Sequence, residues 1–438
     1  MFKPSHLSSL QIFQLLRYAS YICIGIGLAK LHIPQTEIGE YETFLMVSGM
    51  LSFFWVSGTI NTMLAAFPKQ DTENRRYLLF NTFLILSTGS LLAGIFLQVF
   101  SGNVLTFLNK NAEGNLIQLT EVYIILTCPS FINEYILYLE EKRTELLAYA
   151  ILISVITITS VLLPLLLGFT LTHSLYGLIA VAILKNVYTI SLLSRYASFA
   201  INLPLIFNNL KVSFPLMLSV FVSGSAEYID GLIVKAKFND MFFAIYRYGA
   251  KELPVLLIVA NTFSAAMIPV VSKNLPDGLS EIRKGTSRLM NIFFPMSIAL
   301  ILVSPVLYRY LFSESFIYSA LIFNIYLLLI IPRVLFPQSI LTGLGQTRYL
   351  LFSSIIELSI NFSVSVYLAG KIGLPGVAIG SFVAYVIDKL FLGAILYLKF
   401  RIRPGEFIKT KTFLIYIVLL FLSFGLSQYL STTDFWNF

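Results

Sequence analysis

Long apolar runs alternate with short polar stretches along nearly the whole chain. A bilayer core about 30 Å thick needs roughly 20 apolar residues in a helix that crosses it, and the pattern predicts thirteen such runs. Their expected bounds are 10–29, 42–66, 77–100, 118–139, 146–168, 174–194, 210–236, 242–271, 289–312, 318–342, 348–369, 374–398 and 412–430. The loops between them are short. The pattern therefore predicts an all-α polytopic membrane protein with no extramembrane catalytic domain.

The loop cations predict how these helices are oriented. Cytoplasmic loops of membrane proteins carry an excess of Lys and Arg. With the amino terminus inside, eighteen loop cations fall on the cytoplasmic side and six on the other side. We therefore expect a cytoplasmic amino terminus and, after thirteen spans, an external carboxyl terminus. This asymmetry also accounts for the net charge of +8 without a nucleic-acid partner.

A faint repeat relates the two halves of the chain. Lys30 precedes Tyr41 by eleven residues, and Lys235 precedes Tyr246 by the same interval. Because a six-helix unit preserves orientation, the copies are expected to be related by an axis along the membrane normal. We predict two six-helix lobes in a parallel pseudo-repeat around a central cavity, and one extra C-terminal helix. The expected bounds are 1–200, 205–400 and 410–432.

The composition agrees with a membrane protein and offers little for catalysis. Hydrophobic residues make up 57% of the chain and charged residues 12%, against about 25% charged in soluble domains. Cys23 and Cys128 fall in predicted spans and are expected to be small core side chains. The three histidines are too separated to suggest a metal cluster. The sequence therefore predicts a membrane protein with no catalytic residues, metal or cofactor.

Twelve charges remain inside the predicted spans. Each costs on the order of 3 kcal/mol at the centre of a membrane helix, so together they must face one another or water. The cations are Arg17, Lys185, Arg247, Lys251, Arg333 and Lys389. The acids are Glu134, Glu227, Asp230, Glu252, Glu357 and Asp388. Their number favours a hydrated cavity between the helices.

Four of these charges are expected to face one another across a hairpin of the seventh and eighth spans. Glu227 and Asp230 are three residues apart and should share a helix face. Arg247 and Lys251 are four apart and should do the same. Counting from the outer turn places Asp230 level with Arg247 and Glu227 level with Lys251. Two interpretations stay open: an ion-pair ladder that holds the hairpin, or acids that sense ions beside cations that bind substrate.

A second group of charges is expected near the midplane of the membrane. Glu357 and Asp388 are the acids at this level and can pair with two of the four cations, so the surplus cations require an anionic ligand or bound water. Pro254 and Pro332 remove backbone hydrogen bonds beside intramembrane charges and permit kinks. The four cations lie about ten residues, roughly 15 Å, from the cytoplasmic ends of their helices: Arg17, Lys185, Arg333 and Lys389.

The sequence of the first predicted helix resembles that of a known family. Its segment and the following turn read LLRYASYICIGIGLAKLHIPQTEIGEYETF. This is similar to the first-helix pattern of Wzx-type polysaccharide flippases, members of the multidrug/oligosaccharidyl-lipid/polysaccharide (MOP) exporter superfamily. Arg17 and the run Ile38–Tyr41 match that pattern, whereas His32 stands where the family usually has Gly.

The second half extends the resemblance. FPLMLSVFVSGSAEYIDGLIV resembles the start of the family's second lobe, with Pro215 and Asp230 at the expected places. AIYRYGAKELP looks like the start of the eighth helix, but its charged residues depart from the common form and leave the substrate open. Together the similar segments and the twelve-helix core cover about residues 5–400.

The resemblance implies a flippase of the bacterial inner membrane that moves an undecaprenyl-pyrophosphate-linked oligosaccharide by alternating access. The expected partners are the lipid-linked oligosaccharide, membrane lipids and a coupling ion, H⁺ or Na⁺. The cavity cations would receive the pyrophosphate, with Arg17, Arg247 and Arg333 first because arginine suits bidentate phosphate contact, and then Lys251, Lys185 and Lys389. The candidates for ion coupling or counter-ions are Glu227, Asp230, Glu357 and Asp388.

Two other functions remain as alternatives. A multidrug antiporter of the same superfamily would use acids to bind organic cations, and the surplus of buried cations argues against it. An integral-membrane polysaccharide polymerase or glycosyltransferase would carry its active site on a large external loop, and no such loop is predicted here.

Overall fold

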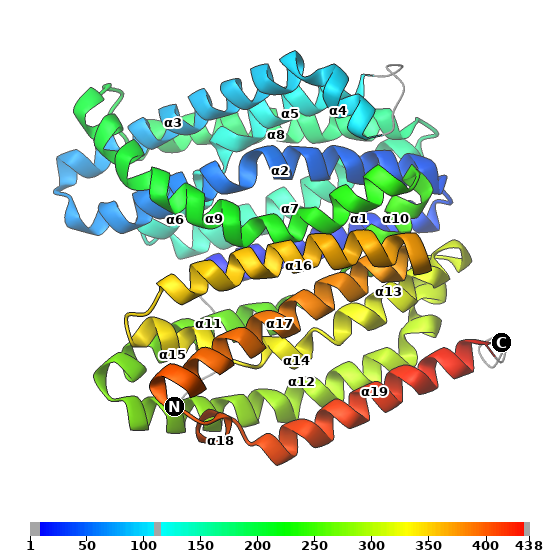
Figure 1. Cartoon of the computed structure of the whole chain (residues 1–438). Helices are drawn as coiled ribbons and strands as arrows, with labels where there is room; N and C mark the ends of the chain where they lie inside the picture. Colours follow the sequence, from blue (N-terminus) through cyan, green and yellow to red (C-terminus); the bar gives the residue numbers. More distant parts are fainter. Residues whose placement is uncertain (1–8, 109–114, 433–438) are drawn as a thin grey trace. The chain divides into compact units, whose positions relative to one another are not determined.

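The computed structural model describes residues 9–108 and 115–432, except for the side chains of residues 208, 219, 223, 226, 227, 431 and 432. Within these ranges the chain forms α-helices and two short 3₁₀ helices, and no strand is present (Figure 1). Among the described residues, thirteen helical segments are long and apolar enough to cross a membrane. The predicted all-α polytopic fold with 13 spans is confirmed.

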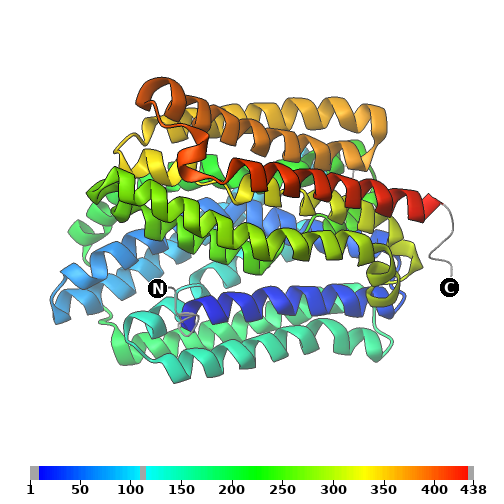
Figure 2. The ribbon, with the colours of Figure 1, turned by 90° about the horizontal axis from the view of Figure 1, so that it is seen from below.

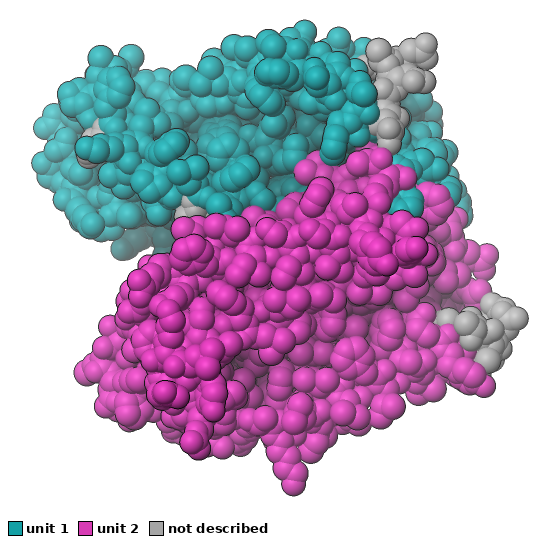
Figure 3. All heavy atoms as spheres, in the orientation of Figure 1, with its two compact units in different colours: residues 1–228, 238–241 teal, residues 229–237, 242–438 magenta. Residues whose placement is uncertain are grey.

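The chain divides into two compact units, which Figure 3 distinguishes by colour. Unit 1 comprises residues 1–228 and 238–241. Within it α1 packs on α7, α3 on α5, and both α5 and α7 on α8. Its helices are α1 (Ser9–Lys30), α2 (Gln35–Ala66), η1 (Phe67–Lys69), α3 (Thr72–Val99), α4 (Ser101–Phe107), α5 (Leu116–Ser130), α6 (Asn133–Leu139), α7 (Arg143–Leu166) and α8 (Leu171–Tyr196). It also contains the first part of α9 (Leu203–Lys237).

Unit 2 comprises residues 229–237 and 242–438. Within it α16 and α17 run side by side (Figure 1), and α19 lies along α12 (Figure 2). Its helices are the last part of α9, most of α10 (Asp240–Gly249), α11 (Pro254–Lys273), α12 (Leu275–Leu311), η2 (Glu314–Phe316), α13 (Ile317–Leu327), α14 (Ile330–Arg333), α15 (Pro337–Gly343), α16 (Arg348–Ile372), α17 (Leu374–Phe400), α18 (Pro404–Phe407) and α19 (Thr410–Thr432).

Three of the predicted spans are interrupted close to prolines. The fourth span divides into α5 and α6 just after Pro129. The eighth ends as a helix at Gly249 and resumes at Pro254, so the expected continuous helix over 242–271 is wrong. The tenth divides into α13, α14 and α15 around Pro332. Proline lacks the backbone donor that continues a helix but fits a first turn, where Pro254 lies. Of the two kinks expected from the sequence, the one at Pro254 is a complete break of the helix, and the one at Pro332 is a short helix, α14, between two interruptions.

Small residues bring α16 and α17 close together. A Cβ atom built on Gly380 would lie 2.0 Å from Ser365 Oγ, so only glycine fits at this crossing. Membrane helices commonly approach through small residues in this way. The contact sets polar side chains of α16, including Asn361, beside Ser381 of α17, where they take part in a buried network.

Exposed side chains along the helices are largely apolar. A helix surface of this kind suits hydrocarbon, where backbone polar groups are satisfied inside the helix. The chain is therefore a multi-pass membrane protein. Side chains more than half exposed include Ile151, Leu152 and Val155 on α7, and Leu414, Val418 and Leu422 on α19.

Candidate functional site

Unit 1 contains a cluster of three charged side chains from three helices: Arg17 of α1, Glu134 of α6 and Lys185 of α8. Arg17 Nη1 lies 3.5 Å from Glu134 Oε1, and this is the only hydrogen bond of the guanidinium within the described residues. The Glu134 side chain is 3% exposed, whereas that of Arg17 is 42% exposed. Lys185 also interacts electrostatically with Glu134, and its Nζ lies 5.0 Å from the centre of the Phe131 ring. Two cations therefore share one carboxylate.

The break between α5 and α6 places two polar residues beside these cations. Asn133 Nδ2 donates to the Tyr149 hydroxyl at 3.2 Å and to the Lys185 carbonyl at 3.1 Å. Its Oδ1 atom and Glu134 Oε2 are buried and accept no hydrogen bond within the described part of the chain. Because buried acceptors normally have a donor, the cluster of Arg17, Glu134 and Lys185 has hydrogen-bonding capacity that its own residues do not use.

Unit 2 contains a more tightly paired arginine. Arg333, the last residue of α14, donates from Nε to Glu252 Oε2 at 2.9 Å and from Nη2 to Glu252 Oε1 at 2.7 Å. Nη2 also donates to the Tyr385 hydroxyl at 3.0 Å, and the guanidinium lies 4.4 Å from the centre of that ring. The side chains of Arg333 and Glu252 are 23% and 15% exposed. This bidentate pair joins two helix breaks, because Glu252 lies between α10 and α11.

Asp230 of α9 forms a separate buried site in unit 2. Its Oδ2 atom accepts hydrogen bonds from Tyr246 at 3.1 Å, from Tyr326 at 2.7 Å and from Ser381. Its Oδ1 atom is buried without a hydrogen-bond partner among the described residues. A carboxylate surrounded by hydroxyl groups can bind a proton or a small hard cation, since both favour oxygen ligands.

The hydroxyl network continues from Ser381 into α16. Asn361 Nδ2 lies 3.4 Å from Ser381 Oγ, and Ser365 Oγ donates to Asn361 Oδ1 at 3.0 Å. Four helices thus contribute oxygen atoms near Asp230: α10, α13, α16 and α17. No group of three His, Cys, Asp or Glu side chains able to hold a metal is found in residues 9–108 and 115–432.

Lys389 and Asp388, adjacent residues of α17, form an ion pair with each other. Lys389 Nζ lies 2.8 Å from Asp388 Oδ2, although adjacent residues of a helix point about 100° apart. Ser353 donates to the other oxygen of Asp388. Glu357 interacts electrostatically with Asp388, Lys389 and Arg333. These residues form one electrostatic group within unit 2.

Arg247 and Lys251 do not share a helix face, contrary to the prediction. Arg247 lies in the last turn of α10 and Lys251 in the connection before α11, and both make interactions within the molecule. Asp230 bonds to hydroxyl groups and makes no ion pair within the described residues, so the expected rung between Asp230 and Arg247 is wrong. The second rung involves Glu227, whose side chain lies outside the described residues.

The sequence analysis missed the uncharged polar residues of these clusters. Tyr326, Tyr385 and Ser381 are not distinguished from other polar residues of the spans, and the chain contains 24 tyrosines. Asn133 carried a weak signal, because it adjoins Glu134 and follows Pro129 by four residues. Counting charges finds ionic groups but not the hydroxyl and amide groups that bind them.

Comparisons with known sequences and structures place the chain in context. A family model described as "Polysaccharide biosynthesis protein" matches residues 28–321, more than half of the 438 residues. A search of curated protein sequences gives no significant match.

Several solved structures share the fold. The lipid II flippase MurJ, in an inward closed conformation, aligns with a TM-score of 0.70 at 15% identity, covering 97% of this chain and 99% of that one. An inward-facing multidrug resistance MATE family transporter of the MOP superfamily gives 0.60 at 15%, covering 87% and 95%. A MOP superfamily transporter from Pyrococcus furiosus gives 0.55 at 14%, covering 94% of each chain. The chain has the fold of these transporters.

Proposed function

This chain belongs to the polysaccharide biosynthesis protein family, which confirms its resemblance to polysaccharide flippases, and we propose that it flips a lipid-linked oligosaccharide across a membrane. The substrate in this proposal is an undecaprenyl-pyrophosphate-linked unit of O-antigen, capsule or exopolysaccharide. The membrane is the bacterial inner membrane, with the amino terminus cytoplasmic and the carboxyl terminus external. Alternating access takes place between two six-helix lobes, 1–200 and 205–400, around a central cavity.

The state of Arg17 is the observation that carries this proposal. Its side chain is 42% exposed and contacts Glu134 through one nitrogen at 3.5 Å. A guanidinium has five N–H donors, and four of them have no partner among the described residues. An arginine held in this way can bind a second anion without first breaking a strong ion pair.

The charge of the unit 1 cluster suits a diphosphate. By formal charge, Arg17 and Lys185 contribute two cations and Glu134 one anion, so the cluster has an excess of one cation. Burying a diphosphate without cations would be prohibitive, and charge-assisted bonds from arginine to phosphate are among the strongest hydrogen bonds in proteins. Arg17 provides a planar donor group for two phosphate oxygens, and Lys185 provides a point charge beside it.

In this proposal the other four predicted cations contact the substrate only after Arg17 and Lys185 have bound it. Arg247 lies next to the break between α10 and α11 and Lys251 lies within it, so a change of helix angle there would move both. Arg333 and Lys389 already bind carboxylates, at 2.7 Å and 2.8 Å. They would contact a substrate only after those ion pairs open. Arg17 and Lys185 are therefore the first receptors.

Asp230 is the candidate for coupling transport to H⁺ or Na⁺. Three hydroxyl groups donate to one of its oxygens, while the other oxygen has no donor among the described residues. A proton on Oδ1, or a cation held between Oδ1 and rotated hydroxyl oxygens, would remove the uncompensated buried charge. Glu227, Glu357 and Asp388 are secondary candidates.

Export of surface polysaccharide tests the proposed function. The chain is expressed in a host that makes the cognate glycan but lacks its own flippase, and R17E is compared with the matched control R195E. Arg195 belongs to the same unit and also lies 3.5 Å from a glutamate, Glu145, but at the end of α8. We expect R17E to reduce export at least about tenfold, because an acid would repel the diphosphate, and R195E to change it less than about twofold.

The same strains separate the alternatives. Wild-type export with loss in R17E supports the proposal, provided that both variants reach the membrane in equal amounts. Equal export by R17E and R195E would contradict it. Protection from cationic dyes without any glycan export would instead identify an antiporter. Glycan polymerisation that continues on the cytoplasmic side without export would identify an enzyme.

A further inference from the structure

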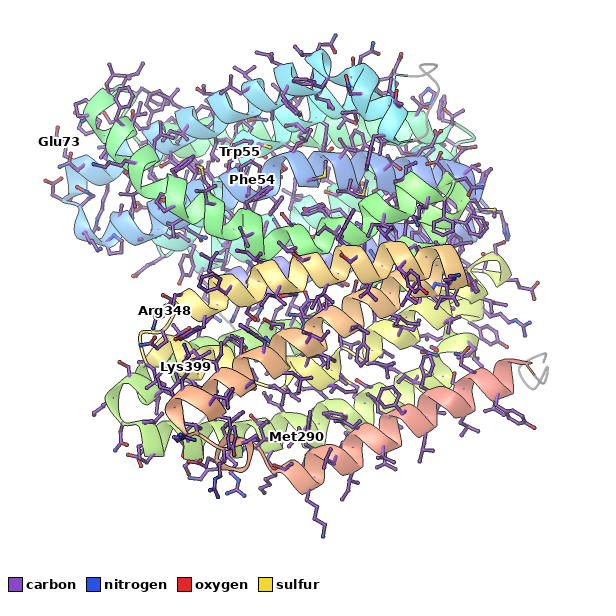
Figure 4. All side chains as sticks on the ribbon, viewed as in Figure 1. Phe54, Trp55, Glu73, Met290, Arg348 and Lys399 are labelled. Carbon is purple, nitrogen blue, oxygen red and sulfur yellow. The ribbon has the colours of Figure 1, made fainter. Side chains whose placement is uncertain are left out.

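A second group of cations, at one end of unit 2, has no role in the proposed function. Arg348 begins α16 and Lys399 lies in the last turn of α17, and Figure 4 shows the two side chains at the same end of these helices. Both are exposed and lie on the side expected to be cytoplasmic. Neither forms an ion pair with a carboxylate in the described part of the chain.

Both cations bind one tyrosine hydroxyl. Arg348 Nη2 lies 3.2 Å from the Tyr349 hydroxyl oxygen, and Lys399 Nζ lies 2.8 Å from the same atom. The guanidinium and ammonium groups lie 4.9 Å and 4.8 Å from the centre of the ring. The ring itself is buried, with 9% of Tyr349 exposed. A fixed aromatic ring therefore holds two flexible cations together.

This arrangement leaves positive charge and hydrogen-bond donors unused. Because both nitrogens lie close to one oxygen, they are at most about 6 Å apart and repel each other. A neutral hydroxyl group accepts hydrogen bonds but does not offset two charges. An anion bound between the two cations would remove the repulsion and accept the free N–H groups of both.

The surroundings favour an amphiphilic anion. Leu351 and Phe352 follow in the first turn of α16 and are 52% and 57% exposed. Leu398, next to Lys399, is 66% exposed. A polar, positively charged site thus borders an apolar surface that faces hydrocarbon. A lipid with an anionic phosphate headgroup has the same order of groups along its length.

We propose that Arg348, Lys399 and Tyr349 form a binding site for the phosphate of an anionic phospholipid in the cytoplasmic leaflet. Tyr349 positions the two cations, and the phosphate oxygens accept from both. The acyl chains lie along the exposed apolar side chains of α16 and α17. This site is independent of the proposed flippase activity and of the cluster of Arg17, Glu134 and Lys185.

Native mass spectrometry of the full-length protein from nanodiscs tests this site. The nanodiscs contain phosphatidylcholine with or without phosphatidylglycerol, and R348Q/K399Q is compared with K409Q/K411Q, which removes the same charge from exposed lysines near α19. We expect R348Q/K399Q to reduce retained phosphatidylglycerol at least about fivefold. K409Q/K411Q should change it less than about twofold.

Further measurements complete the test. Raised salt should release phosphatidylglycerol from the wild type, because the contact is ionic, and this result does not depend on how well a variant folds. Inorganic phosphate that binds the wild type but not R348Q/K399Q, while lipid retention is unchanged, would assign the site to a soluble phosphate and overturn the lipid proposal. Equal retention by the two double variants, or retention insensitive to salt, would also overturn it.

Discussion

Arg17 and Arg333 are both arginines in the middle of apolar spans, but they differ in how tightly they are paired and how far they are exposed. In unit 1, Arg17 touches Glu134 through one nitrogen at 3.5 Å and keeps 42% of its side chain exposed. In unit 2, Arg333 makes two hydrogen bonds to Glu252 at 2.7 and 2.9 Å, a third to Tyr385, and is 23% exposed. The same residue type is thus loosely paired in one unit and fully engaged in the other.

This difference in pairing distinguishes a structural arginine from one that can bind a ligand, a distinction that the sequence alone does not make. A bidentate pair with an aromatic contact fixes geometry, and Arg333 joins the break before α11 to the end of α14. A single contact of 3.5 Å to a buried carboxylate constrains the position of the Arg17 side chain only weakly. We therefore propose that Arg333 stabilises the broken helices of unit 2, whereas Arg17 is available to an anionic ligand. The predictions below test this division.

The largest expected effect on stability comes from removing the acid of the tight pair. Glu252→Gln leaves Arg333 charged and partly buried without its counter-ion, and should destabilise the protein by about 2–4 kcal/mol. Thermal unfolding in detergent measures this change. The matched variant Glu134→Gln should cost less than Glu252→Gln, because the Arg17 side chain is 42% exposed and keeps its contact with solvent. Equal losses in the two variants would remove the distinction between the units.

The second cation of unit 1 should have a smaller effect, on transport. Lys185→Gln removes one of two cationic side chains near Glu134 and should lower glycan export about threefold, less than R17E, with little change in stability. Export relative to the amount of protein in the membrane measures this. Lys185→Arg should restore most of the activity. A neutral variant that exports normally would show that Lys185 does not contact the substrate.

A change in the aromatic partner of Arg333 should have a smaller effect on stability than the loss of Glu252. Tyr385→Phe keeps the ring that packs on the guanidinium but removes the hydroxyl that accepts from Nη2 at 3.0 Å. Loss of one hydrogen bond to a charged group should cost about 1–2 kcal/mol in unfolding free energy. Glycan export should stay near the wild-type level. A large loss of export in a stable Tyr385→Phe protein would place Arg333 in the substrate path.

The sequence predicted the membrane fold well because the length and hydropathy of the runs determine it. All thirteen spans have helical counterparts. The pattern did not predict where helices stop. Pro254 was expected to kink the eighth span, but the helix ends at Gly249, and this moves Lys251 away from the helical register of Arg247. Positions inferred from helical spacing are lost wherever the helix breaks.

The partners of the intramembrane charges could not be predicted from the sequence either. Asp230 was expected to face Arg247, and it binds the hydroxyl groups of Tyr246, Tyr326 and Ser381 instead. These residues come from helices distant in sequence, and hydroxyl groups carry no charge that a count would detect. Helical spacing relates residues on one helix, whereas packing between helices decides which of them meet.

Equilibrium binding of undecaprenyl diphosphate to the purified protein tests the central claim most directly. The wild type, R17Q and the control R195Q are titrated in detergent with this lipid and with undecaprenol, which lacks the diphosphate. If Arg17 receives the diphosphate, R17Q weakens binding of undecaprenyl diphosphate at least about tenfold, and R195Q changes it less than about twofold. Undecaprenol binding should be alike in all three proteins. Binding of undecaprenyl diphosphate by R17Q as tight as that of the wild type would contradict the account.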